Sequence, residues 1–144
     1  MPIRILIADD HAVVRQGLRA FLDTDPDLEV VGEATDGHEA VSMAHRLRPV
    51  VVLMDLVMPG LDGIAATQVI KHELPAIQVV GLTSALDDAS MLGLLRAGAI
   101  GYLLKDTRAE DLRYALKAAA AGQVQLAPKA TARLMREVVG PERP

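Results

Sequence analysis

With 144 residues, the chain has the length of one domain with a well-buried core; it is 51% hydrophobic but only 2% aromatic, so aliphatic side chains and methionine must build that core. It contains no cysteine, which excludes a disulfide framework and a thiolate metal site, and its formal net charge of -4 argues against a nucleic-acid-binding surface within this chain. Acidic residues come too early for a secretory signal peptide, and no apolar run reaches membrane-spanning length. We therefore expect a soluble, cytoplasmic protein with no membrane partner.

Short apolar runs alternate with helical patterns along the chain. The runs predict buried strands at 3–8, 28–34, 50–54, 77–82 and 99–104. A helical pattern follows each strand, and these patterns end at Asp25–Pro26, Pro49, Pro75, Gly98 and Gly122. Strict alternation of five strands with five helices predicts an α/β fold with a doubly wound parallel sheet, for which 2-1-3-4-5 is one of two common strand orders.

Two of the predicted helices begin with a capping box, in which the first side chain and a glutamate three residues later accept hydrogen bonds from unpaired N–H groups. These boxes are Asp36 with Glu39 and Thr107 with Glu110. After a connector at 122–128, Pro128 in a first helical position predicts one further helix, to about Val138.

Polar side chains follow four of the predicted strands, at the point where each strand ends. They are Asp9 and Asp10, then Asp55, then Thr83 and Ser84, and finally Lys105. Because the carboxyl ends of parallel strands share one edge of the sheet, we expect these groups to converge. Three neighbouring carboxylates need a cation to stay ionised, and an all-oxygen set favours Mg²⁺, Mn²⁺ or Ca²⁺ over zinc. The hydroxyl and the ammonium suit phosphate oxygens, so the set is equipped for a carboxylate that receives a phosphoryl group.

Four motifs at this edge resemble those of bacterial two-component receiver domains. They are Ile-Ala-Asp-Asp-His at 7–11, Met-Asp-Leu-Val-Met-Pro-Gly-Leu-Asp-Gly at 54–63, Leu-Thr-Ser at 82–84 and Gly-Tyr-Leu-Leu-Lys-Asp at 101–106. The details are most similar to the NarL/FixJ branch, whose receivers precede a LuxR-type helix-turn-helix domain. The resemblance implies a flavodoxin-like (CheY-like) five-stranded sheet of order 2-1-3-4-5, a receiver domain at 1–122, and a linker with a helix at 123–144 leading toward a DNA-binding domain absent from this chain.

By this resemblance, Asp55 is expected to accept a phosphoryl group from a histidine kinase. Asp10 and Asp55 would bind Mg²⁺, or Mn²⁺ in its place, directly, and Asp9 would bind it through water. The backbone carbonyl of Val57 would complete the protein ligands. The chain would not be an enzyme with a separate substrate but a signalling receiver that promotes its own phosphorylation and dephosphorylation.

The same resemblance implies a switch. Thr83 and Lys105 would each hold a phosphoryl oxygen and, with Asp55, form the catalytic set. Tyr102 occupies the family's switch-aromatic position: phosphorylation would pull Thr83 toward Asp55 and leave space into which the ring of Tyr102 turns. The expected output is a changed surface or a homodimer, with transcription controlled through DNA contacts made only by the C-terminal domain.

Two departures from the family pattern have consequences. Asp106 follows Lys105 where many receivers have proline, so the usual cis peptide bond is not assured. Val57 and Ala85 offer no polar side chain to position an attacking water, which predicts a long-lived acyl phosphate. None of the four histidines, His11 included, is expected to bind metal.

Three other functions remain as alternatives. A phosphatase of the haloacid-dehalogenase type also combines an aspartyl nucleophile with Mg²⁺, but it requires Asp-x-Asp after the first strand, where this chain has the adjacent pair Asp9–Asp10. An interaction module that is never phosphorylated fits poorly with an intact set of acids. A nucleotide- or flavin-binding domain is the weakest alternative, because no G-x-G-x-x-G follows the first strand.

Overall fold

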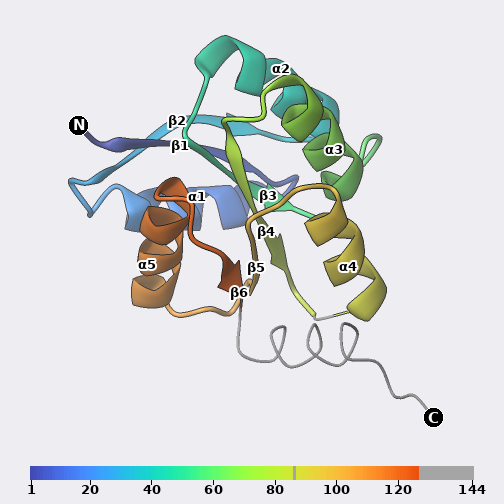
Figure 1. The fold of residues 1–144 in the computed structure, drawn as a ribbon. Coiled ribbons are helices and arrows are strands. Elements are labelled where there is room, and N and C mark those ends of the chain that lie inside the picture. Colours follow the sequence, from blue (N-terminus) through green and yellow to red (C-terminus); the bar gives the residue numbers. More distant parts are fainter. Residues whose placement is uncertain (86, 127–144) are drawn as a thin grey trace.

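The strands of the chain lie side by side in one parallel sheet (Figure 1). The computed structural model describes residues 1–85 and 87–126. Within them, six strands pair in the order β2-β1-β3-β4-β5-β6, each neighbouring pair parallel. The strands are β1 (Ile3–Ala8), β2 (Leu28–Ala34), β3 (Val51–Asp55), β4 (Gln78–Thr83), β5 (Gly101–Leu104) and β6 (Gln125–Leu126). The predicted doubly wound sheet with the order 2-1-3-4-5 is confirmed.

Helices cover both faces of the sheet. They are α1 (Ala12–Leu22), α2 (Gly37–Leu47), α3 (Gly63–Glu73), α4 (Asp88–Arg96) and α5 (Ala109–Ala120). In Figure 1, α1 and α5 lie on one face, whereas α2, α3 and α4 lie on the other. Both faces of the central strands are therefore buried, which explains why their sequences are mostly apolar.

The pleat of β1 divides its side chains between two layers of core. Ile5 and Ile7 pack in the cluster that includes Leu116 of α5, whereas Leu6 and Ala8 pack in the cluster that includes Ile70 of α3. This alternation follows from the two-residue period of a strand. β1 therefore runs through the centre of the molecule, and the residue after it emerges at the edge where β3 also ends.

The two-residue strand β6 is absent from the sequence prediction, which has a connector at 122–128. It extends the sheet beside β5, pairing Gly101 with Gln125 and Tyr102 with Leu126. A strand this short has no hydrophobic period to detect, and it exists because β5 offers an unpaired edge. The predicted helix from Pro128 to Val138 lies outside the described residues.

Helix starts follow the predicted capping chemistry at one of the two predicted boxes. Asp36 accepts from the N–H of Glu39 at 2.8 Å, and Glu39 accepts in return from the N–H of Thr35 at 2.6 Å. The box predicted at Thr107 and Glu110 is wrong. The N-cap of α5 is Arg108, whose side chain has no acceptor and makes no capping bond, while the N–H of Thr107 closes a turn onto the carbonyl of Leu104.

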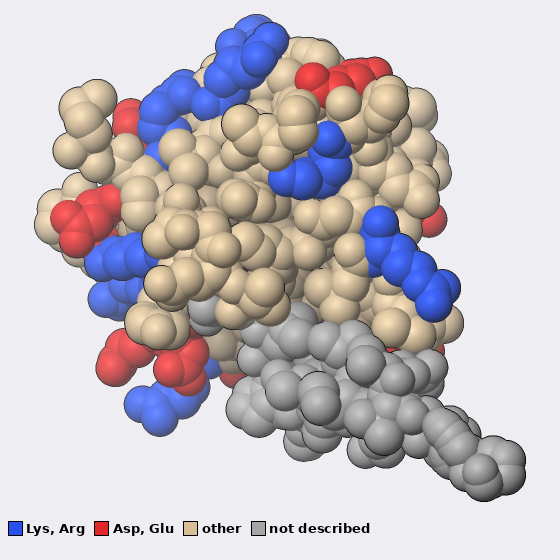
Figure 2. Space-filling view, viewed as in Figure 1, with Lys and Arg blue, Asp and Glu red and all other residues tan. Residues whose placement is uncertain are grey.

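Charged side chains on the face shown in Figure 2 form several separate groups of both signs rather than one basic patch. No helix in the described ranges is both long enough and apolar enough to cross a bilayer.

Candidate functional site

The sheet brings the predicted polar residues to one edge. Asp9 directly follows β1, and Asp55 is the last residue of β3, the strand paired with β1. Thr83 ends β4, and Lys105 follows β5, where its N–H donates to the carbonyl of Thr83 at 2.7 Å. These groups therefore come from four adjacent strands, as the sequence predicts from the rule for parallel sheets.

Lys105 reaches back across the edge to two buried carboxylates. Its Nζ lies 3.1 Å from Oδ2 of Asp9 and 3.3 Å from Oδ1 of Asp55. Asp9 is 1% exposed and Asp55 is 3% exposed, whereas the side chain of Asp10 is 30% exposed. Two buried acids thus share one ammonium, and the third acid is partly exposed.

The acids are close enough to share a divalent ion. Asp9, Asp10, His11 and Asp55 each offer one ligand atom, and these atoms all lie within 4.8 Å of one another. Oδ2 of Asp55 is buried and accepts no hydrogen bond from the described part of the chain. A buried carboxylate oxygen without a donor is costly. The three carboxylates of this set fit a hard cation such as Mg²⁺.

The sequence predicts no part in the site for His11, but in the structure its ring lies against the acids. Its Nδ1 is 3.2 Å from Oδ1 of Asp9 and 3.2 Å from Oδ1 of Asp10, although the side chain is 64% exposed. Its backbone N–H also donates to Oδ1 of Asp9 at 2.8 Å. In the sequence, the indication of this contact is that His11 directly follows Asp9 and Asp10.

The electrostatics of the site favour a cation. Burial raises the pKa of the Asp55 carboxyl and the charge of Asp9 raises it further, while Lys105 and the N–H of Val57 oppose this rise without cancelling it. Burial works to lower the pKa of Lys105, but its hydrogen bond to Asp9 and the charge of Asp55 outweigh burial and raise it. Lys105 therefore stays charged, and its one ammonium faces two carboxyl groups.

The residues expected to act as the switch are each held by other parts of the chain. The hydroxyl of Thr83 donates to the carbonyl of Ala85 at 2.9 Å, inside a local turn. Tyr102 is fully buried and packs with Leu56, Met91 and Leu94. The ring already occupies an interior position, so the expected inward turn does not start from an exposed ring here.

The loop after β3 holds Asp55 by its backbone. The N–H of Val57 donates a long 3.5 Å bond to Oδ1 of Asp55, while the Val57 side chain is 78% exposed. At Gly63, the first residue of α3, a Cβ atom would collide with the backbone of Asp55 and Leu56. Among the described residues no peptide bond is cis, so the bond between Lys105 and Asp106 is trans.

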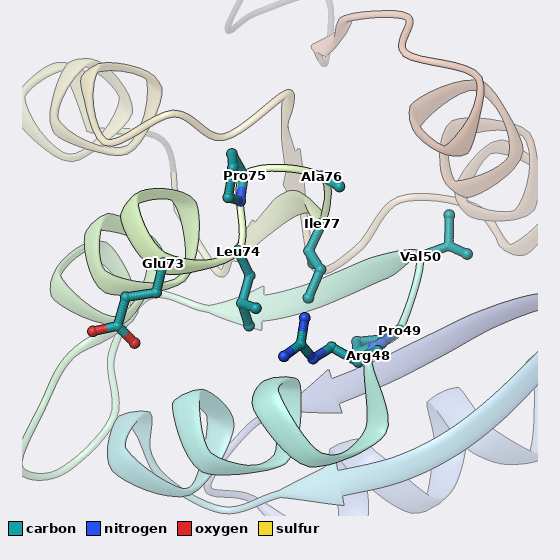
Figure 3. Close-up of a pocket in the computed structure, with 8 residues that line it drawn as sticks. All are labelled: Arg48, Pro49, Val50, Glu73, Leu74, Pro75, Ala76 and Ile77. Atoms are coloured by element: carbon teal, nitrogen blue, oxygen red, sulfur yellow. The ribbon is translucent and has the colours of Figure 1, made fainter.

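A separate hollow of about 430 Å³ lies at the opposite edge of the sheet (Figure 3). It is lined by the last residue of α3 and by residues of the loops that lead into β3 and β4, together Arg48, Pro49, Val50, Glu73, Leu74, Pro75, Ala76 and Ile77. None of the predicted site residues lines it, so it plays no part in the chemistry of the acids.

Known proteins are similar to this chain in sequence. Residues 5–117 match the family described as response regulator receiver domain. The chain is 47% identical over 133 residues to the transcriptional regulatory protein LiaR of Bacillus subtilis, covering 92% of this chain and 63% of that protein. It is 43% identical over 129 residues to the response regulator protein VraR of Staphylococcus aureus, covering 90% of this chain and 62% of that protein. The matches thus span somewhat less than two thirds of these relatives.

Solved structures agree with the fold. A LuxR-family two-component response regulator from Aurantimonas superposes with a TM-score of 0.90 at 34% identity, covering 97% of this chain and 100% of that one. The isolated receiver domain of RcsB from Salmonella enterica, solved in the presence of the phosphomimetic BeF3-, superposes with a TM-score of 0.83 at 29% identity, covering 92% and 99%. With the predicted resemblance confirmed in sequence and in structure, the chain belongs to the response regulator receiver domain family.

Proposed function

We propose that this receiver domain accepts a phosphoryl group from a histidine kinase on Asp55, in a reaction that requires Mg²⁺. The observation that carries the proposal is the state of the Asp55 carboxylate. Lys105 and the N–H of Val57 both contact Oδ1, and Oδ2 is buried without a donor from the described residues. One oxygen is therefore anchored and the other remains for bond formation.

Asp9, Asp10 and Asp55 are the residues that would hold Mg²⁺ or Mn²⁺, together with the backbone carbonyl of Val57. When bound, the ion supplies positive charge that offsets the carboxylates and the incoming phosphoryl oxygens. The side chains of this chain do the rest of the positioning. Asp9 holds Lys105 at 3.1 Å, which keeps the ammonium beside Asp55.

In the transfer, Oδ2 of Asp55 forms a bond to phosphorus as the bond between phosphorus and the histidine nitrogen of the kinase breaks. The electron pair of the broken bond stays on that nitrogen. Lys105, fixed between two acids, would pair with a phosphoryl oxygen, and the hydroxyl of Thr83 would leave the carbonyl of Ala85 to donate to another.

The proposed switch is the exchange of this Thr83 hydrogen bond. Moving the end of β4 toward Asp55 would shift the loop that leads into α4, and α4 packs on Tyr102 through Met91 and Leu94. Because the ring of Tyr102 is already buried, phosphorylation would stabilise this interior position. The changed surface of α4, β5 and α5 would then favour a second copy of the chain or another partner.

The proposed output, control of transcription, is supported by the relatives. LiaR is described as a transcriptional regulatory protein, and this chain matches 63% of its length. We therefore extend the proposal to a cytoplasmic regulator whose DNA contacts are made by a C-terminal helix-turn-helix domain beyond this chain.

The test uses the purified protein with Mg²⁺ and acetyl phosphate, followed by intact mass. We expect a gain of one phosphoryl group that is lost in Asp55→Asn and retained in the control Asp62→Asn. The control is matched because Asp62 lies in the same loop and caps α3 through Ala65 at 2.8 Å, a role that asparagine also fills. A gain that persists in Asp55→Asn, or no gain in the unaltered protein, would overturn the proposal.

A further inference from the structure

Behind the acid pair, two arginines of α1 meet one glutamate of β2. Nε of Arg15 donates to Oε1 of Glu33 at 3.2 Å, and Nη1 of Arg19 donates to Oε2 at 2.7 Å. The side chain of Arg15 is 15% exposed and that of Glu33 is 26% exposed. Glu33 therefore holds both arginines in place. Neither α1 nor β2 contains a residue assigned to the site.

Only one of the two arginines goes on to reach the site. Nη1 of Arg15 donates to the backbone carbonyl of Asp9 at 2.8 Å, while Arg19 has no such contact and instead approaches Asp23 at 4.0 Å. Asp9 lies one residue beyond β1, with its own N–H bonded to the carbonyl of Ala34 at 3.0 Å. Arg15 thus holds the backbone carbonyl of Asp9, the residue that follows β1, by a hydrogen bond.

This carbonyl belongs to the peptide that joins Asp9 to Asp10. Holding the plane of that peptide limits the directions in which both carboxylates can leave the backbone, because a trans peptide is rigid and only the flanking dihedral angles remain free. An arginine can hold this plane and bind Glu33 at once, since its planar guanidinium presents several N–H groups in fixed directions.

We propose that Arg15 is a positioning residue for the acid pair Asp9–Asp10, an inference that rests on the proposed function, in which these acids hold Mg²⁺. Arg15 orients the peptide between the two acids, and Glu33 holds Arg15 in the orientation that allows this. Arg19 completes the brace without touching the site.

The charge of Arg15 and its proposed positioning role predict opposite changes in Mg²⁺ affinity when Arg15 is replaced. Losing a positive charge near the acids would by itself tighten Mg²⁺ binding. Losing the hydrogen bond that orients the acids would weaken it, and removing groups that orient metal ligands weakens affinity by about 10- to 100-fold in other proteins. The direction of the change therefore separates the two roles.

The experiment compares Arg15→Gln with Arg19→Gln in the full 144-residue chain. Each variant loses one positive charge and one bond to Glu33, but only the first loses the contact to Asp9. Isothermal titration gives the dissociation constant for Mg²⁺, and urea unfolding shows that both variants are folded. We expect the constant to rise by about tenfold in Arg15→Gln and to stay near that of the unaltered protein in Arg19→Gln.

A third variant tests rescue. In Arg15→Lys, an ammonium can still donate to the carbonyl of Asp9 but cannot reproduce the fork that also holds Glu33, so we expect recovery of part of the affinity. The half-saturating Mg²⁺ concentration for labelling by acetyl phosphate should follow the same order, with maximal rates restored at high Mg²⁺.

Equal changes in Arg15→Gln and Arg19→Gln, or tighter binding in both, would overturn the positioning role in favour of charge alone. Mg²⁺ binding that depends on Arg15, in a protein that takes no label on Asp55, would support the positioning role while rejecting the proposed phosphorylation. Absence of Mg²⁺ binding by the unaltered protein would reject the positioning role outright.

Discussion

The ammonium of Lys105 lies 3.3 Å from Oδ1 of Asp55, and it comes from a strand two places away in the sheet. The lysine also contacts Asp9 at 3.1 Å, so one cation separates two buried acids. The charges of Asp9, Asp55 and Lys105 therefore affect both the free energy of unfolding and the proposed phosphoryl transfer.

Replacing this cation should expose the repulsion between the acids. We expect Lys105→Met to lower the free energy of unfolding by about 2 kcal/mol without divalent ions, since two buried carboxylates lose their partner. Mg²⁺ should restore part of the loss, and labelling of Asp55 by acetyl phosphate should slow. Urea unfolding with EDTA and with Mg²⁺ measures the first two effects. A variant as stable as the unaltered protein in EDTA would show that Lys105 does not offset the acids.

The close approach of α3 to β3 predicts a different sensitivity at two glycines. In Gly63→Ala, the new methyl group would meet the backbone of Asp55 and Leu56, so we expect a loss of about 1–3 kcal/mol and reduced labelling. Gly17→Ala is the control, because a Cβ atom there meets nothing within 4 Å and the residue lies inside α1. The control should gain about 0.5–1 kcal/mol. Equal stability changes in thermal or urea unfolding would contradict the packing explanation.

The brace at Glu33 should make stability depend on acid pH. The hydrogen bond from Arg19 lowers the pKa of Glu33 below its ordinary value of 4.5; burial works against this, and Arg15 adds to the lowering. Because the pKa is lower in the folded protein than in the unfolded chain, this stabilisation is complete above the unfolded value and disappears as pH falls through the folded value.

The measurement is the difference in the free energy of unfolding between the unaltered protein and Glu33→Gln, taken from pH 7 downward. We expect about 1 kcal/mol in favour of glutamate at neutral pH, shrinking below pH 4.5. A difference that stays constant across this range would show that the ionised carboxylate does not contribute.

The lifetime of the acyl phosphate should respond to the residue at position 57. Val57 is 78% exposed and has no group to hold an attacking water, so the phosphorylated protein should lose its label slowly. In Val57→Asn, an amide near Asp55 could orient water, and we expect a shorter lifetime. Intact mass after removal of acetyl phosphate follows the decay. Faster decay in the unaltered protein than in the variant would refute this role.

Much of the fold can be predicted from apolar runs alone. A strand covered on both faces is mostly apolar, so β1, β3 and β4 are each visible as short apolar runs, and their observed bounds differ from prediction by at most one residue. The meeting of Asp9, Asp55 and Lys105 is predictable for a related reason, since parallel strands place their carboxyl ends at one edge.

Other features cannot be read from local sequence because they depend on where elements meet. Arg15 and Glu33 are 18 positions apart and pair only because α1 packs beside β2. The two residues of β6 carry no period, and α5 begins only after a turn in which the N–H of Thr107 bonds to the carbonyl of Leu104.

The sequence by itself therefore determined the alternation of strands and helices along the chain, the burial of both faces of the sheet, and the edge at which the acids gather. The tertiary structure alone decided which oxygen of Asp55 is anchored, which partner Thr83 holds, and which arginine reaches Asp9. The reason is one of range: periodicity and strand direction are properties of neighbouring residues, whereas hydrogen bonds of a few ångströms require the packed positions of several elements at once.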